Sequence, residues 1–345
     1  MSESTRSGGG PTGQVTSFEL LYQRLEKIPP LTIAVSAPEE ETVLAALAEA
    51  AARGWILPFL IGEREKLELL LARLELAPDT FTIEDTQPGL TAERAVELVR
   101  SGDAHLLMKG KTPTAELLRA VLNRESGLLR PVNRAPEGED NASASPRILS
   151  HVAVVESPLY PRLMLFTDGG VNIEQPLPVL RDMLHNALEL SRALDTLAPN
   201  VAALALVENV TEKLPETRLA QALVQEADQG RFGRCVVEGP LALDVALSVE
   251  SADSKGIPSK IAGSTDIFLG PNITATNFMV KGLMSLGGAK GGGVVLGAAA
   301  PIVLLSRSDA PDTRLNSITL ALAAVLHYNQ HPDFGNSRQT NLEFK

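Results

Sequence analysis

Two short motifs gather charged and hydroxyl side chains at the ends of buried apolar runs, where an anionic ligand could be held. The first, MKGKTPT, supplies Lys109, Gly110, Thr112 and Thr114 and leads into a helical pattern that contains Arg119. Ammonium groups, hydroxyls and the free N–H groups of a helix N-terminus all favour an anion. An ordinary capped turn with solvated lysines fits the same spacing. The motif therefore predicts either an anion site or a simple turn.

The second motif, LLSRSDAPDTRLNS, places Ser306 and Arg307 at the end of an apolar run and Asp309, Asp312 and Asn316 at the start of a helical pattern. A hydroxyl, a guanidinium and carboxylates at such a junction suit an oxyanion or phosphate with a general base nearby. The acids also have a simpler interpretation, because either could just cap the helix that the intervening proline begins. Considered alone, the motif favours capping.

Two further segments follow apolar runs and are candidate binding loops, because ligands of open parallel sheets bind beyond the carboxyl ends of the strands. In TDGGVNI, the polar residues are Asp168 and Asn172. The run SLGGAKGGGVVLG contains Gly288 and Lys290, and its glycines permit a close approach of backbone to ligand. Its spacing matches neither GxxxxGK[ST] nor GxGxxG, which favours a flexible connection.

Composition excludes several classes of function. The 345 residues carry a net charge of −11, which argues against a general nucleic-acid binder. A single cysteine rules out an internal disulfide, and the five histidines lack metal-ligand spacing, so no metal site is expected. No apolar stretch approaches the ~20 residues that span a bilayer, and no secretory signal opens the chain. We expect a cytoplasmic protein without a membrane partner.

The elements that must position these motifs alternate between short β-rich runs and longer helical patterns from Leu31 onward. Repeated β-α units with short connections require parallel strands and crossover helices. The pattern therefore predicts an α/β protein with open, mostly parallel sheets covered on both faces. In the first motif, Thr112 is the expected N-cap of the helix, with Pro113 in its first turn.

A break in this alternation divides the chain. Residues 131–147 are rich in Pro, Ser, Asn and acids, which is typical of an exposed insertion. We predict a disordered leader at 1–16, a first α/β domain at 17–150 that includes the insertion, and a second at 151–310, with the active-site cleft between the domains. The last helical pattern and the tail, 311–345, could return to the first domain. Directly after the insertion, ILSHVAVVE and RLMLFTDG are strand-like runs that could pair with each other.

Four blocks in a fixed order resemble the phosphate acetyl/butyryltransferase family, more closely its butyryl branch. They are LLMKG…T…LLRAVL, LSHVAVVE…TDGGVNI, EGPLALDVALS…KGI and VVLGAAAPIVLLSRSD…LNSITLAL. The resemblance extends from about Leu31 to Leu326 and leaves out the leader, the insertion and the tail. An ordered series of long blocks is more specific than one short motif.

This resemblance implies reversible acyl transfer: acyl-CoA + phosphate ⇌ acyl phosphate + CoA, with butyryl or another short acyl group. It implies an isocitrate/isopropylmalate dehydrogenase-like fold and a homodimer or higher homo-oligomer. Coenzyme A would be a substrate, with no cofactor and no metal, and an acyl kinase for butyrate or acetate could be coupled to the reaction. A ternary complex would place the thiol against the acyl phosphate carbonyl, so that proximity supplies much of the acceleration.

Site residues follow from the matching positions. A Ser-Arg pair that supports catalysis in the acetyl branch corresponds to Ser306 and Arg307, and the arginine of an LLRP-type helix, a phosphate ligand, corresponds to Arg119. With the loops above, the expected binding residues are Lys109, Gly110, Thr112, Thr114, Arg119, Asp168, Asn172, Gly288, Lys290 and Asn316.

The chain departs from the acetyl branch at two positions. That branch has an aspartate, the proposed base for the thiol, where this chain has Thr313, so Asp309, or less readily Asp312, would take the role. It has an arginine where this chain has Met284, so Lys290 would supply the charge. These departures motivate a second hypothesis, a non-catalytic paralogue that binds CoA or an acyl phosphate. A dehydrogenase of the related fold ranks last, because no dinucleotide fingerprint is present.

Overall fold

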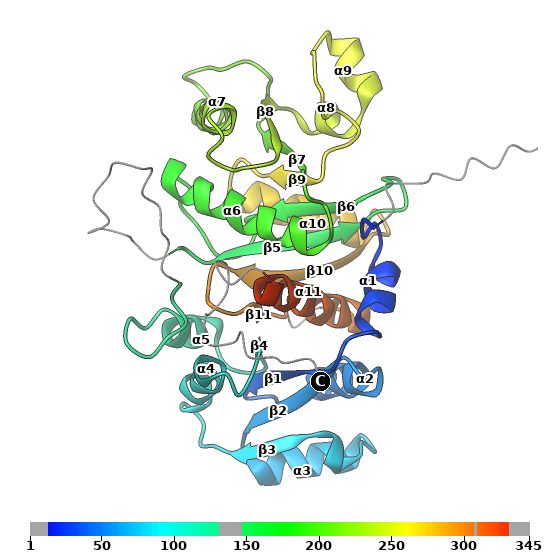
Figure 1. Ribbon diagram of the computed structural model, residues 1–345, viewed down its shortest axis with the longest axis vertical. Coiled ribbons are helices and arrows are strands. Elements are labelled where there is room, and N and C mark those ends of the chain that lie inside the picture. The colour runs from blue at the N-terminus through cyan, green and yellow to red at the C-terminus, as the bar shows by residue number, and fades with distance from the viewer. Residues whose placement is uncertain (1–12, 131–146, 307–308, 331–345) are drawn as a thin grey trace, which may run out of the picture.

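The computed structural model describes residues 13–130, 147–306 and 309–330, and within them eleven strands join in one sheet (Figure 1). Most of the predicted leader and insertion therefore lies outside the described residues. The order across the sheet is β3-β2-β1-β4-β11-β10-β5-β6-β9-β7-β8. The strands are β1 (Leu31–Ser36), β2 (Ile56–Gly62), β3 (Thr82–Asp85), β4 (Leu106–Lys109), β5 (Ser150–Glu156), β6 (Leu163–Thr167), β7 (Asn200–Leu204), β8 (Val236–Leu241), β9 (Ile267–Leu269), β10 (Lys290–Leu296) and β11 (Ile302–Val303).

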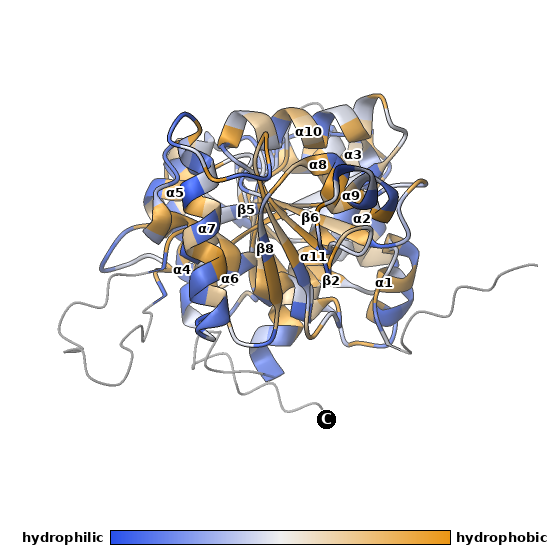
Figure 2. Cartoon of the chain, turned by 90° about the horizontal axis from the view of Figure 1, so that it is seen from above, coloured by the Kyte–Doolittle hydropathy of each residue, from blue (hydrophilic) through white to orange (hydrophobic). Residues whose placement is uncertain are grey.

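Helices cover both faces of this sheet, and Figure 2 shows the apolar strands enclosed between them. Each helix turns an apolar stripe toward the sheet, as expected for elements that bury one side. No described helix is both long and apolar enough to cross a membrane. The helices are α1 (Phe18–Leu25), α2 (Glu41–Ala52), α3 (Arg64–Arg73), the 3₁₀ turn η1 (Pro78–Thr80), α4 (Thr91–Ser101), α5 (Thr114–Val121), α6 (Leu177–Ala193), α7 (Pro215–Asp228), α8 (Leu243–Leu247), α9 (Val249–Lys255), α10 (Ile273–Ser285) and α11 (Pro311–Gln330).

Strand direction confirms the predicted α/β class and adds one difference. β10 pairs antiparallel with β11 and with β5, and β5 pairs antiparallel with β6, as the two adjacent strand-like runs predicted. The other neighbours are parallel. The strands form one sheet rather than separate sheets, because the β10–β11 hairpin inserts between β4 and β5 and joins the two halves.

The apolar core differs between the two faces of the sheet. On one face a single core runs through both halves, from α1 and α2 to α6 and α7, with α11 across the middle. On the other face the core is divided: one part lies under α4 and α5, and the other lies under α8 and α10. The strands between these two parts are β11, β10 and β5. The divided face therefore leaves room for a cavity in the middle of the sheet.

Helix α11 makes contacts with both halves of the sheet and its covering helices. It packs on β10 and contacts α2 and α1 on one side and α6 on the other. The division of the chain into two domains stays a prediction.

A buried ion cluster lies where residues 130 and 147 flank the undescribed segment. Glu189 of α6 is only 2% exposed and receives both guanidinium nitrogens of Arg130 at 3.1 Å, together with the guanidinium of Arg147. Arg130 also stacks on the Tyr328 ring of α11, 5.2 Å from its centroid. Burial alone would raise the pKa of Glu189, but Arg147 and Arg130 outweigh it and hold that pKa below its usual value.

Replacement of this carboxylate should destabilise the protein. Glu189→Gln leaves two buried guanidinium groups without a counter-charge, so we expect a loss of about 3–5 kcal/mol at pH 7. Because the folded-state pKa is depressed, the stabilisation is present above the unfolded pKa and is lost as the pH falls through the folded pKa. Denaturant unfolding at several pH values should therefore show the difference from wild type shrinking below about pH 4. A difference as large at pH 2 as at pH 7 would contradict the assignment.

Candidate active site

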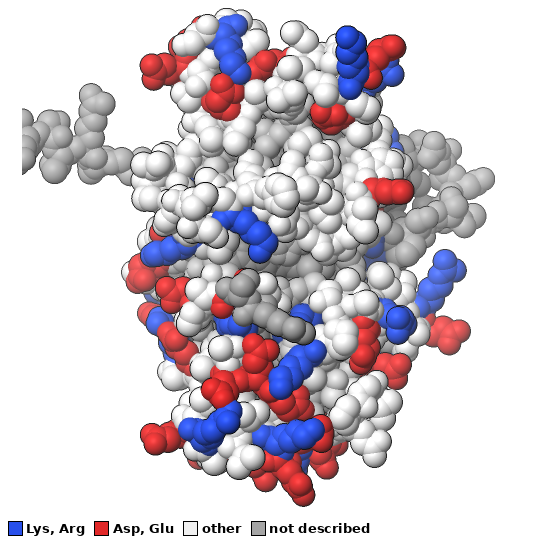
Figure 3. Space-filling model, turned by 180° about the vertical axis from the view of Figure 1, so that it is seen from behind, with Lys and Arg blue, Asp and Glu red and all other residues white. Residues whose placement is uncertain are grey.

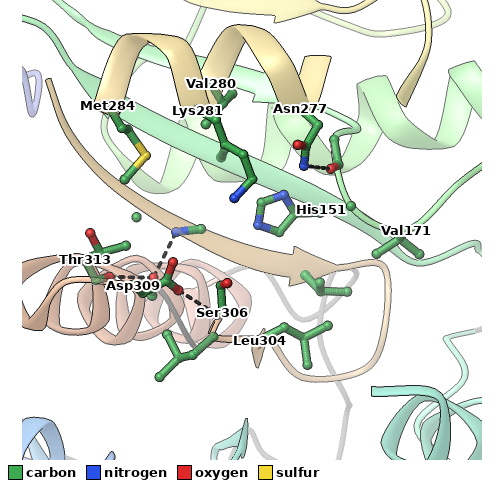
Figure 4. A pocket seen from close by; sticks show the side chains of 18 of the residues that line it. His151, Val171, Asn277, Val280, Lys281, Met284, Leu304, Ser306, Asp309 and Thr313 are labelled. Carbon is green, nitrogen blue, oxygen red and sulfur yellow. Dashed lines mark hydrogen bonds between the residues drawn. The ribbon is translucent and has the colours of Figure 1, made fainter. Parts of the chain in front are cut away.

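A cavity of about 280 Å³ occupies the gap on the divided face, and we call it the inner cavity (Figure 4). Its floor is formed by β5 and β10, one wall by α10, and the opposite wall by the segment that follows β11. Its lining residues are Thr114, His151, Ala153, Gly169, Gly170, Val171, Thr276, Asn277, Val280, Lys281, Met284, Gly292, Gly293, Val295, Leu304, Leu305, Ser306, Asp309, Thr313 and Ser317.

A second cavity of about 610 Å³, here called the lysine groove, adjoins the first. It is lined by Glu40, Val43, Lys109, Gly110, Lys111, Thr112, Pro113, Thr114, Leu305, Ser306 and Arg314. Thr114, Leu305 and Ser306 line both cavities. The two motifs that the sequence analysis singled out therefore meet in space, at the carboxyl ends of the parallel strands β4 and β11.

One of the three glycines in β10, Gly292, allows helix α11 to approach the strand closely. A methyl group on Gly292 would lie 2.8 Å from Asn316 Cβ and 3.0 Å from Ser317 N. Asn316 Nδ2 donates to the Gly291 carbonyl at 2.9 Å, and Ser317 Oγ accepts from Gly293 N at 3.0 Å. The interpretation of the glycines at 291–293 as a flexible connection is wrong, because they are strand residues. The missing side chain of Gly292 admits the helix, and those of the other two leave room for Met284 and His151.

Asn316 is fully engaged in this packing. It is buried, and its Oδ1 accepts a hydrogen bond from the Tyr22 hydroxyl while its amide holds β10. The structure therefore places this predicted binding residue beneath the cavity floor rather than in its lining.

Ser306 and Asp309 are joined by two hydrogen bonds. Ser306 N donates to Asp309 Oδ2 at 2.7 Å, and Asp309 N donates to the Ser306 carbonyl at 3.1 Å. The carboxylate of Asp309 therefore holds the backbone of the exposed Ser306 at the point where the two cavities join (Figure 4). Arg307, the predicted partner of the serine, lies outside the described residues.

Asp168 organises the loop after β6. The buried carboxylate accepts hydrogen bonds from the backbone N–H groups of Gly170, Val171 and Asn172 at 2.7–3.1 Å and from the Asn172 amide at 2.6 Å. Asn172 also donates to the Leu149 carbonyl at 2.8 Å. Both predicted residues therefore hold the shape of a loop whose other members line the inner cavity.

The helix after β4 begins one residue later than predicted. Pro113 is the N-cap of α5, which starts at Thr114, and Thr112 does not cap it. Thr112 is buried instead, and its hydroxyl lies 2.6 Å from Ser36 Oγ in β1. This contact satisfies the hydroxyl of Thr112 and links the end of β1 to the loop after β4, beneath the lysine groove.

Three further predicted binding residues, like Asp168, Asn172 and Asn316, line neither cavity. Arg119 lines a separate hollow of about 670 Å³ between α4 and α5, among several glutamates. Lys290 is exposed and pairs with Glu156 at 3.8 Å. Gly288 occupies an exposed turn with φ of 66°.

Two polar residues of the inner cavity were missed by the sequence analysis. His151 is the one polar side chain among the apolar residues of β5 that point to the divided face, and it is half-buried, with its ring lining the cavity. Burial lowers the pKa of His151, and the carboxylates of Asp168 and Asp309 oppose this shift. Lys281 of α10 reaches over the imidazole in Figure 4. The spacing of Asn277, Lys281 and Met284 along one helix face was the available signal.

The positively charged side chains near the cavities are few, and they are not part of a broad positively charged surface. On the face in Figure 3, Lys and Arg lie among Asp and Glu. In the lysine groove, Lys109 and Lys111 stand beside Arg314, which is buried and 3.7 Å from Glu40. Within the described ranges, no three His, Cys, Asp or Glu side chains lie close enough to hold a metal ion.

Fold and site together define an α/β protein in which a groove with two lysines lies at the ends of parallel strands, next to a small pocket with apolar walls. The family model described as phosphate acetyl/butaryl transferase matches residues 89–322. This chain belongs to that family.

Individual relatives agree with this assignment. The chain is 35% identical to a phosphate butyryltransferase of Clostridium acetobutylicum, over 89% of this chain and 97% of the relative. It is 36% identical to a phosphate acetyltransferase of Rhizobium meliloti, over 89% and 93% of the two chains. The solved structure of a branched-chain phosphotransacylase from Enterococcus faecalis V583 matches with a TM-score of 0.74 and 28% identity, over 86% and 99%.

The close approach of α11 to β10 can be tested by adding methyl groups. Gly292→Ala should lower the free energy of unfolding by about 1–3 kcal/mol, because its methyl meets the backbone of α11. Gly291→Ala is the matched control: its methyl meets only the flexible end of Met284, so the cost should be smaller. Equal denaturation midpoints for the two variants would show that the helix does not lie this close to the strand.

Proposed function

We propose that this protein is a phosphate acyltransferase that interconverts acyl-CoA plus phosphate with acyl phosphate plus CoA, using butyryl or another short acyl group. The observation that carries the proposal is the junction at Ser306, where a pocket with apolar walls meets a groove that contains two lysines and an arginine. This reaction needs both environments at one point, because an uncharged acyl group must move between two strongly anionic molecules.

The two cavities suggest how the substrates divide. The lysine groove suits the phosphate groups of CoA, with Lys109, Lys111 and Arg314 as cations. The inner cavity suits the acyl chain, against Val280 and Met284, and the reacting phosphate, beside Lys281. The CoA thiol would then reach the acyl carbonyl at Ser306, and this positioning supplies much of the rate acceleration.

Ser306 is placed to stabilise the charge that develops on the acyl oxygen during transfer. Its hydroxyl is exposed at the junction, and its backbone is fixed by Asp309. A donor held in advance of the reaction costs no reorganisation when the oxyanion forms. Asp309 is therefore a positioning residue for the serine, and the role of proton acceptor predicted for it competes with this hydrogen bond.

The size of the inner cavity favours a short chain. A dry cavity of roughly 150 Å³ already accommodates benzene, so about 280 Å³ suits an acyl group of a few carbons together with phosphate. The names of the relatives, phosphate butyryltransferase, phosphate acetyltransferase and branched-chain phosphotransacylase, support the same range.

The sequence-based expectations of a homo-oligomer, a cytoplasmic location, coupling to an acyl kinase and activity without cofactor or metal are part of this proposal. Light scattering of the purified protein measures the oligomeric state, and an assay after chelation tests the expected independence from metal.

A panel of acyl-CoA substrates tests the activity directly. With phosphate present, free CoA should be released from a four-carbon acyl-CoA, with kcat/KM falling at hexanoyl-CoA because the longer chain exceeds the cavity. The assay is thiol release measured with a colorimetric thiol reagent, and omission of phosphate is the control. Binding of CoA in calorimetry without thiol release for any member would instead support the non-catalytic paralogue.

Variants at the junction should separate turnover from phosphate binding. Ser306→Ala removes an oxyanion donor, so kcat should fall by about 100-fold with KM little changed. Lys281→Ala removes a charge-assisted contact, so KM for phosphate should rise by about 10- to 100-fold.

Two further variants sharpen this experiment. Lys260→Ala, an exposed lysine that lines neither cavity, is the control and should match wild type. Arg119→Ala tests the family-based phosphate ligand, and its position in a separate hollow predicts a smaller change in KM than Lys281→Ala. A larger rise in KM for Arg119→Ala than for Lys281→Ala would instead place the phosphate site at α5.

A further inference from the structure

We propose that the His151 imidazole is the proton carrier of the reaction, taking the proton of the attacking group and delivering it to the leaving group. The inference rests on the proposed acyl transfer and assigns its acid-base step to a residue of β5. Neither ring nitrogen is hydrogen-bonded to any described residue, and Nδ1 is buried without a partner. Buried polar atoms are nearly always paired, so this exception requires an explanation.

The surroundings of His151 form a site that fits an imidazole. A methyl group on Gly293 would lie 2.4 Å from Nε2, and one on Gly170 would lie 3.4 Å from Cγ. Glycines on both sides of the ring therefore leave space for it, while β5 directs it into the inner cavity next to Ala153. The ring shares that cavity with Ser306, where the acyl carbonyl would lie, and with Lys281, where phosphate would bind (Figure 4).

The chemistry of transfer needs one mobile proton. When HPO₄²⁻ attacks acyl-CoA, a P–O oxygen forms a bond to the carbonyl carbon and the C–S bond breaks. The proton of the phosphate must leave, and the departing thiolate must gain one. A neutral imidazole accepts the first proton and, as imidazolium, donates it to sulfur, which restores the neutral ring. In the opposite direction it takes the thiol proton as sulfur attacks the acyl phosphate and returns it to the departing phosphate.

An imidazole suits this role better than the carboxylate of Asp309. A thiol has a pKa of about 8.5, an imidazolium about 6.5 and a carboxylic acid about 4, so the imidazole is much closer in basicity to the thiolate. Asp309 is also engaged by Ser306 N at 2.7 Å. It can act on His151 as a nearby negative charge, as Asp168 does.

The charged groups around His151 come from three elements: Asp168 follows β6, Asp309 precedes α11, and Lys281 lies on α10. Burial favours the neutral ring, whereas the two carboxylates favour the imidazolium. Because the net shift lowers the pKa of His151, the neutral form required for catalysis persists through neutrality. We therefore expect kcat to decline on the acid side only below about pH 6.5.

Two substitutions test the proposal with purified full-length protein. His151→Gln should lower kcat by about 10²- to 10⁴-fold in both directions, with KM for phosphate changed by less than about threefold, and should remove the acid limb of the pH profile. His151→Ala should be equally slow, and added imidazole should restore part of its turnover in proportion to its concentration.

His105→Gln is the matched control. His105 is also largely buried with a lowered pKa, but its Nδ1 accepts from Thr32 N at 3.0 Å and it lines neither cavity. This variant should keep the wild-type pH profile and should not respond to imidazole.

The outcomes separate this inference from the proposed function. If wild type transfers acyl groups and His151→Gln keeps kcat within about threefold, the proton-carrier role is overturned and the activity stands. If wild type releases no CoA from any acyl-CoA, the proposed function fails and the inference fails with it. Should neither His151 variant fold, carbethoxylation of wild type decides: loss of turnover must track modification of His151 by mass spectrometry, and turnover that survives it refutes the role.

Discussion

The close approach of helix α11 to strand β10 is the constraint on which the site depends. The β11 strand is short, so the edge of β10 toward Lys290 has no strand partner on that side, and side chains of α11 take the place of one. Only glycines allow a helix backbone this near to a strand. The approach also sets where the chain after β11 must turn, and that turn carries Ser306. The cavity floor, the serine and the start of α11 are therefore fixed by one packing contact.

Asymmetry between the faces of the sheet explains why the site lies where it does. The undivided core continues through both halves of the sheet. The divided core on the other face leaves a cavity over the middle strands. A protein with a net charge of −11 repels anions at long range, so it must attract them with few cations at short range. The lysines at the end of β4 and on α10 line the two cavities and are the cations available for such short-range attraction.

Local patterns predicted most of the elements, because β-rich runs and helical repeats in this chain agree with their final environment. The α/β class, the pairing of β5 with β6 and the meeting of the two polar motifs are all present. Where the role of a residue depends on tertiary packing, the sequence alone did not predict it. Asn316 and Asp168 carry ligand-like side chains, yet both are used to hold backbone. His151 was overlooked because a lone histidine in a strand has no distinguishing spacing, and Gly292 gave no local sign that a helix lies on it.

The Arg130–Glu189–Arg147 cluster has a consequence for how the chain can vary. Both ends of the intervening segment meet at a single carboxylate, so the distance between them is set by the scaffold and not by the segment itself. When both ends of a loop are held in place, the entropic cost of a longer loop grows only with the logarithm of its length. This position is therefore suited to accept a reporter peptide, an affinity handle or an entire foreign module, while the two cavities, which no residue of α6 lines, keep their architecture.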